Sequence, residues 1–227
     1  MPAVIVAAVC VRLGFWQLSR LEQRRASNAR IVAAGALPEL RLNEGGTGDG
    51  RTDRRAVARG SFDRSQELVL RGFVYQGAPG VRIVTPLRLE GSDSAVLVLR
   101  GFVTADDAVR PTVDSLDEPG EKEIRGVLKP IATEPDSGGP LLRGGATTWR
   151  RLDLAALRAR MPYPILEAYL IADRDSTRHG FPIRLEPPAL NDGPHLSYAL
   201  QWFGFAVTAM VVAGVIALRG KGRDGKA

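Results

Sequence analysis

Residues 196–218 read LSYALQWFGFAVTAMVVAGVIAL and contain no charged side chain. As a helix, this segment of 23 residues would extend roughly 34 Å, because each residue adds about 1.5 Å. That length exceeds the hydrocarbon core of a bilayer, which is about 30 Å thick. Tyr198 and Trp202 lie near its first end, where amphipathic rings favour the headgroup boundary. We predict a transmembrane helix over 196–218.

The formal charge of +6 is concentrated at the two ends of the chain. Residues 219–227 carry a net +3 and residues 1–20 a net +2, which leaves +1 for everything between them. Basic residues beside a span favour the cytoplasmic side, so we predict a cytoplasmic tail at 219–227. A charge confined to the ends argues against a nucleic-acid-binding protein. With 44% hydrophobic and 25% charged residues, the whole chain is too polar to be embedded in a membrane throughout.

A second, shorter apolar run covers residues 3–18 and is interrupted by Arg12. A cleaved signal peptide is the alternative to a membrane anchor. A signal peptide needs positive charge before the apolar run and a small-residue cleavage site after it, whereas only Met1 and Pro2 precede this run. An uncleaved anchor fits better. Both spans carry stripes of small side chains, which could let helices approach closely or simply face lipid: Ala3, Ala7, Cys10 and Gly14, and then Ala209, Ala213 and Ala217.

Two spans make the chain a membrane hairpin with both ends on one side. We therefore predict a bacterial plasma-membrane protein whose termini are cytoplasmic and whose domain, residues 31–194, is extracytoplasmic. Four arginines beside the first span oppose the positive-inside tendency: Arg20, Arg24, Arg25 and Arg30. Long polar domains translocate largely regardless of charge, so the assignment is kept.

The segment between the spans is predicted to be mostly β. A helical continuation covers Leu21 to Ala34, and a short helix follows the capping residue Asp153 as far as Arg160. Apolar and β-branched stretches bounded by turn residues predict strands at 56–62, 67–75, 81–89, 95–103, 123–129 and 165–172. The predicted fold class is an α+β membrane protein, with two transmembrane helices flanking a mostly antiparallel β domain, built as a small sheet or barrel.

Motifs for catalysis are scarce in this sequence. The chain has one cysteine, Cys10, and two histidines, His179 and His195, and it contains neither Gly-x-Ser-x-Gly nor His-Glu-x-x-His. His179 lies in a polar loop and is predicted to be solvent-exposed. We expect no enzyme.

His195 has more suggestive surroundings. It follows Asn191-Asp192-Gly193-Pro194, a capping sequence with Pro at a first helical position, so it should lie in the opening turn of the second span. There the helix dipole disfavours a protonated imidazole, which leaves a lone pair for a metal. His195, Tyr198 and Trp202 share one helical face, and Ala199 beside them leaves space. This pattern suits a flat apolar ligand such as heme, although an interfacial histidine beside an aromatic belt is also commonplace.

The first span ends in a comparable way, because Trp16 and Arg20 lie four residues apart on one helical face. Three motifs then resemble the Surfeit locus protein 1 family. Residues 14–20, GFWQLSR, match the family's Gly-x-Trp-Gln-x-x-Arg at the end of its first span. Residues 100–102, RGF, resemble its Arg-Gly-Trp, with Phe102 in place of the usual Trp. Residues 195–203, HLSYALQWF, match the His-x-x-Tyr-Ala-x-Gln-Trp that opens the second span, although Gly193-Pro194 precedes it where the family often shows Asn.

The resemblance implies a non-catalytic assembly factor for cytochrome c oxidase in the respiratory chain. It implies heme A as the cofactor and His195 as the residue that binds its metal. It also makes pocket or interhelix candidates of Tyr198, Gln201, Trp202, Trp16 and Arg20. The implied partners are oxidase subunits or other assembly factors, beside the lipid bilayer. The alternative is a scaffold protein that stabilises oxidase subunits during assembly without binding heme.

Overall fold

The computed structural model describes residues 2–45, 52–105, 120–134, 139–143, 146–174, 182–185 and 189–224. They form two compact units, which are described separately. One unit consists of Met1–Val32 together with Ala189–Ala227, and the other of Ala33–Pro188.

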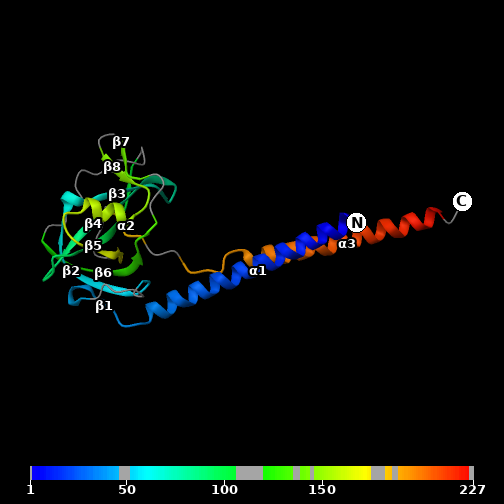
Figure 1. Ribbon diagram of the computed structural model, residues 1–227, viewed down its shortest axis with the longest axis horizontal. Coiled ribbons are helices and arrows are strands. Elements are labelled where there is room, and N and C mark those ends of the chain that lie inside the picture. Colours follow the sequence, from blue (N-terminus) through cyan, green and yellow to red (C-terminus); the bar gives the residue numbers. More distant parts are fainter. Residues whose placement is uncertain are drawn as a thin grey trace. The chain divides into compact units, whose positions relative to one another are not determined.

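The first unit is a pair of long helices, α1 (Pro2–Gly35) and α3 (His195–Asp224), which lie side by side and antiparallel (Figure 1). By length and composition, α1 and the part of α3 up to Arg219 could each cross a membrane. The predicted spans 3–18 and 196–218 lie within them, and the continuation over 21–34 belongs to the same helix as the first span. The predicted fold class is confirmed, because two apolar helices at the ends of the chain flank a mostly antiparallel sheet domain.

Small residues form the contact between the helices. Ala7 and Cys10 of α1 are buried against Ala206 of α3, and Gly14 lies against the ring of Phe203. A Cβ on Gly14 would lie 2.5 Å from a ring carbon of Phe203, so only glycine fits without displacing the ring. The stripe predicted on the first span is therefore a packing surface. On the second span Ala209 packs against this contact, whereas Ala217 is exposed and fits the alternative of a lipid-facing residue.

The second unit is a β domain with one short helix, α2 (Leu154–Arg160), and two single turns, η1 (Leu42–Glu44) and η2 (Arg64–Gln66). Its strands are β1 (Leu40–Arg41), β2 (Arg55–Phe62), β3 (Leu68–Tyr75), β4 (Ala78–Leu89), β5 (Ala95–Thr104), β6 (Glu121–Pro130), β7 (Leu141–Arg143), β8 (Ala146–Trp149) and β9 (Ile165–Ala172). All six predicted strands are present. The short strands β1, β7 and β8 were not predicted, since two to four residues carry too little periodicity.

Five strands close into a ring. The sheet order is β1-β2-β6-β9-β5-β4-β3-β8-β7, and β2 pairs in addition with β4. The closing contact depends on Gly60, because a Cβ there would lie 1.8 Å from the carbonyl oxygen of Arg88. Gly126 likewise allows β6 and β9 to approach closely. A Cβ there would lie 1.9 Å from the carbonyl oxygen of Ile171. The strands outside the ring leave β1 and β7 as the two edges of the sheet.

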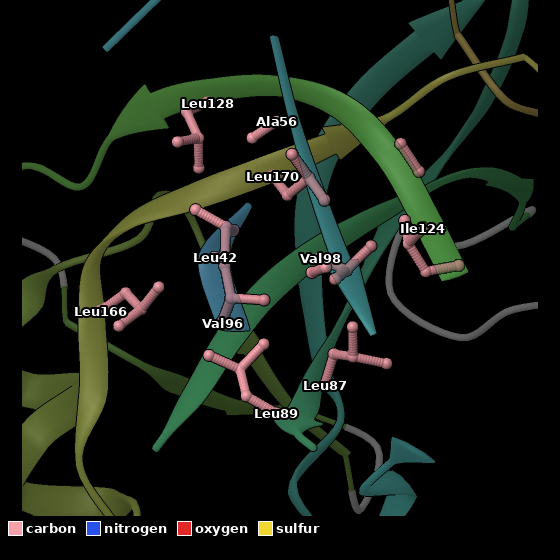
Figure 2. Close-up of a cluster of buried hydrophobic side chains, with 12 residues drawn as sticks. Leu42, Ala56, Leu87, Leu89, Val96, Val98, Ile124, Leu128, Leu166 and Leu170 are labelled. Carbon is pink, nitrogen blue, oxygen red and sulfur yellow. The ribbon is translucent and has the colours of Figure 1, made fainter. Parts of the chain in front are cut away.

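The ring encloses one of the two main cores of the domain. Figure 2 shows side chains from all five strands pointing toward one another, among them Ala56, Leu87, Val98, Ile124 and Leu170. The opposite face of β5 packs outward in a second core that includes Leu154 and Leu157 of α2. The predicted cap of α2 is confirmed, since the Asp153 side chain accepts a hydrogen bond from the Ala156 amide at 3.1 Å. Strand β5 is therefore buried on both faces.

The motif Arg100–Phe102 lies at the end of this central strand. A register shift between β4 and β5 accompanies it, and the Arg100 guanidinium is fully buried. Its Nη1 donates hydrogen bonds to Glu67 at 3.1 Å and to Thr85 at 3.4 Å. Gly101 has φ +144°, a conformation that favours glycine, and Phe102 is buried. The motif thus maintains the fold of the domain.

Candidate functional site at the start of the second helix

His195 is the first residue of α3, as the sequence predicted for the opening turn. The preceding turn is ordered by its own side chains: the Gly193 amide donates to Asn191 Oδ1 at 3.1 Å. The Tyr198 amide donates to the Pro194 carbonyl at 3.1 Å, so Pro194 occupies the cap position rather than the first helical position. The helix therefore begins one residue later than predicted.

The end of α1 holds this turn from the side. Arg25 Nε donates to Asp192 Oδ2 at 2.8 Å, and Asn28 Nδ2 donates to the Asn191 carbonyl at 3.0 Å. Both contacts are exposed, so each contributes a modest stabilisation. Together they fix the chain immediately before His195 to a helix that is more than 160 residues away in sequence.

The ring of His195 is partly buried and contacts α1 directly. Its Nδ1 lies 2.9 Å from Oε1 of Gln17. Within the described part of the chain, Nε2 has no hydrogen-bond partner. Gly193 lies on that side of the ring, and a Cβ there would lie 3.6 Å from Nε2. The absence of a side chain at 193 thus leaves room at the nitrogen that Gln17 does not engage.

Of the remaining candidates on α3, one is packed between the helices and two are exposed. Trp202 is half-buried, packs against the small-residue contact between the helices, and meets the ring of Phe205 edge-on at 5.8 Å. Tyr198 and Gln201 are exposed. The expectation that Ala199 leaves open space is wrong, because this residue is only 1% exposed.

On α1, both candidates are exposed. Trp16 is 54% exposed, and Arg20 donates from Nη1 to Gln23 Oε1 at 2.9 Å. Among the described residues, no hydrogen bond or ring contact joins either of them to His195. The structure thus brings His195 to the first span, but through Gln17 rather than through Trp16 or Arg20.

Gln17 is the residue that the sequence analysis did not select. Gln17 lies within the motif at 14–20, but the motif does not indicate what its amide contacts, and its partner is 178 residues away. Its spacing offered a clue: Gln17 follows Gly14 by three residues and Cys10 by seven, so it continues the small-residue stripe to the polar end of the span. The other histidine, His179, lies outside the described residues.

The arrangement fits a single-ligand heme site better than a metal site made of side chains alone. The described residues contain no group of three or more His, Cys, Asp or Glu side chains that could hold a metal ion. One imidazole nitrogen is engaged and the other is open beside a glycine. The macrocycle of a heme supplies four nitrogen ligands to its iron, so one protein nitrogen would be enough to hold the group.

A second feature belongs to the β domain. A surface cavity of about 370 Å³ is lined mostly by charged side chains. Within the lining, Glu123 forms ion pairs with Arg59 at 2.7 Å and with Arg125 at 3.0 Å. Hydrogen bonds from Arg59 and Arg125 hold the pKa of Glu123 below its ordinary value. The cavity is polar and charged, unlike an apolar cofactor pocket.

These features define a class: a membrane protein with a helix pair formed from its two ends and a closed β domain between them. The chain matches the model of the SURF1 family over residues 4–207 and belongs to that family. This is the Surfeit locus protein 1 family that the three motifs resemble. Membership in the SURF1 family is consistent with a role in oxidase assembly. The family is not a known enzyme class.

The chain is similar to three SURF1-like proteins over most of its length. The SURF1-like protein of Rickettsia felis is 28% identical over 214 residues, which cover 92% of each chain. That of Monosiga brevicollis is 26% identical over 238 residues, covering 96% of this chain and 86% of the relative. An uncharacterized SURF1-like protein of Mycobacterium tuberculosis is 24% identical over 213 residues, covering 89% and 75%.

Proposed function

We propose that this protein is a membrane assembly factor for heme-copper cytochrome c oxidase that binds heme A through His195 and passes it to the oxidase. The observation that carries the proposal is the state of the His195 ring at the start of α3, where Nδ1 is engaged by Gln17 and Nε2 is open. The family resemblance supports the choice of heme A, and the imidazole supports the choice of ligand.

Heme A, when bound, supplies an iron that accepts a lone pair from imidazole. His195 Nε2 offers that lone pair. The exposed rings of Tyr198 and Trp16 supply apolar surface near the same end of the helix pair, and Trp202 backs the helix contact. Gln201 and Arg20 are exposed polar groups on the same two helices and are the candidates for contacts with polar substituents. A site with a single ligating side chain would suit a carrier, which must release what it binds.

The membrane orientation belongs to the same proposal. Both termini are cytoplasmic, and His195 lies at the extracytoplasmic boundary of the bacterial plasma membrane. The net +3 of residues 219–227 supports this orientation, as does the antiparallel pairing of α1 and α3, which places both ends of the chain on one side.

The test is to purify the protein from cells that make heme A and to record its absorption spectrum. His195→Ala is expected to lose the heme bands or to shift them strongly, because the axial nitrogen is gone. His179→Ala is the matched control, since it removes the only other imidazole of the chain. An unchanged spectrum in His195→Ala would remove His195 from the ligand role.

A scaffold protein that stabilises oxidase subunits without heme is the second candidate. The charged cavity of the β domain favours it, because charged surfaces guide protein encounters and suppress wrong partners. The same purification separates the two candidates. Oxidase that fails to assemble when the gene is deleted, together with a wild-type protein that carries no heme at any stage, would favour the scaffold.

A further inference from the structure

We propose that Gln17 is a positioning residue that holds His195 in the tautomer with the proton on Nδ1, so that the lone pair is on Nε2. This positioning role rests on the proposed function, because the tautomer of His195 matters only if its ring binds heme. The tautomer itself is a property of the free protein and can be measured without heme.

The chemistry follows from the two atoms in contact. An amide oxygen can only accept a hydrogen bond, so Gln17 Oε1 at 2.9 Å from Nδ1 requires a proton on Nδ1. In neutral imidazole the other nitrogen then carries the lone pair. Histidine in water prefers the opposite tautomer, with the proton on Nε2, and that form cannot bind a metal through Nε2. The Gln17 contact therefore converts the ring to the form that binds.

Both partners are held in place, so the contact is preorganised. Gln17 is half-buried on the face of α1 that also carries the buried residues Gly14 and Leu21. On the other side, Arg25 and Asn28 of α1 fix the turn before His195 through two hydrogen bonds. Partners of this kind orient the ligating histidine in metal sites, and losing one typically costs about 10- to 100-fold in affinity.

The open nitrogen, Nε2, lies beside Gly193. Gly193 adopts φ +69° and carries no side chain, and a Cβ there would lie within 3.6 Å of Nε2. If the proton were on Nε2 instead, the described part of the chain would offer it no acceptor. The tautomer with the proton on Nδ1 thus satisfies the one donor of the ring.

The first experiment is nitrogen-15 NMR of the full-length protein in detergent, labelled at histidine and measured at about pH 9, where histidine is neutral. His179→Ala assigns the two imidazoles. We expect His195 to show a protonated Nδ1 and an unprotonated Nε2. In Gln17→Leu the signals should move toward a protonated Nε2. A wild-type ring protonated on Nε2 would overturn the proposal, because Gln17 would then donate to the ring from its amide nitrogen.

The second experiment measures heme A titration into the same variants. Gln17→Leu should weaken binding about 10- to 100-fold, and Gln17→Glu, which keeps an acceptor, should restore most of it. Gln66→Leu is the matched control, since it makes the same substitution in η2 of the β domain. Equal affinity in wild type and Gln17→Leu would overturn the positioning role while leaving heme binding intact. A wild-type protein that has the Nδ1 proton but binds no heme would instead refute the proposed function.

Discussion

At the scale of single residues, Asp63 and Tyr163 connect two parts of the β domain that are 100 residues apart. Asp63 caps η2 through the Ser65 amide and accepts a hydrogen bond from the Tyr163 hydroxyl at 2.8 Å. Partial burial raises the pKa of Asp63, but the hydrogen bonds from Ser65 and Tyr163 outweigh it, so the pKa lies below its ordinary value. The ionised carboxylate therefore stabilises the fold above its unfolded-state pKa of about 3.9, and this contribution is lost as pH falls through the lower folded-state value.

Tyr163→Phe removes one of these hydrogen bonds. We expect the free energy of unfolding of the β domain to fall by about 1 kcal/mol at pH 7, and the melting temperature by about 2 to 4 °C. The difference from wild type should shrink at about pH 3, because pH then lies below the unfolded-state pKa of about 3.9 and closer to the lower folded-state pKa of Asp63. Thermal unfolding of the full chain in detergent, followed by circular dichroism at both pH values, measures the effect. Tyr75→Phe is the control, because the Tyr75 hydroxyl only accepts an exposed hydrogen bond from Gln76 at 3.4 Å. A loss that is the same at both pH values would contradict the role of Asp63.

At the scale of elements, the helix pair depends on a seam of small side chains. Cys10 of α1 and Ala206 of α3 belong to one buried cluster. A second cysteine at Ala206 should therefore form a disulfide with Cys10 under mild oxidation, whereas one at Val207, which is 63% exposed, should not. Counting free thiols by mass spectrometry after denaturation distinguishes the two outcomes. Equal oxidation of both variants would show that the helices do not pair through this seam.

The elements also show where prediction from sequence succeeds and where it stops. Strand β5 was predicted because its run of β-branched residues is typical of buried strands, and α2 because Asp153 is a strong cap. The strand pattern predicts either a small sheet or a barrel and does not decide whether the ring closes. Closure depends on a backbone contact at Gly60, and a lone glycine does not reveal which strand approaches it. Gln17 was missed for the same reason, since its role exists only once α1 and α3 pair.

At the scale of the whole molecule, the residues for the two proposed roles, heme binding and partner contact, lie in different units of the chain. The helix pair carries His195 and Gln17, and the β domain carries the charged cavity. The fully buried Arg100 keeps that domain in one arrangement, because a buried charge requires its partners Glu67 and Thr85 in place. We therefore expect mutations to remove the proposed heme binding and the proposed partner contact separately.

The membrane orientation is the prediction that concerns the complete chain. The first residues of α1 and the last of α3 lie at the same end of an antiparallel pair, so we expect both termini on one side of the membrane. The basic residues after Leu218 favour the cytoplasm for that side, and the long domain between the helices then lies outside. A reporter active only outside the cytoplasm should give signal when fused at Ser137, which lies outside the described residues, and none when fused at Lys226. The opposite pattern would place His195 at the cytoplasmic boundary, and any heme would then be delivered on that side. A cytoplasmic reporter fused at the same two positions is the matched control, because it must give the reverse pattern.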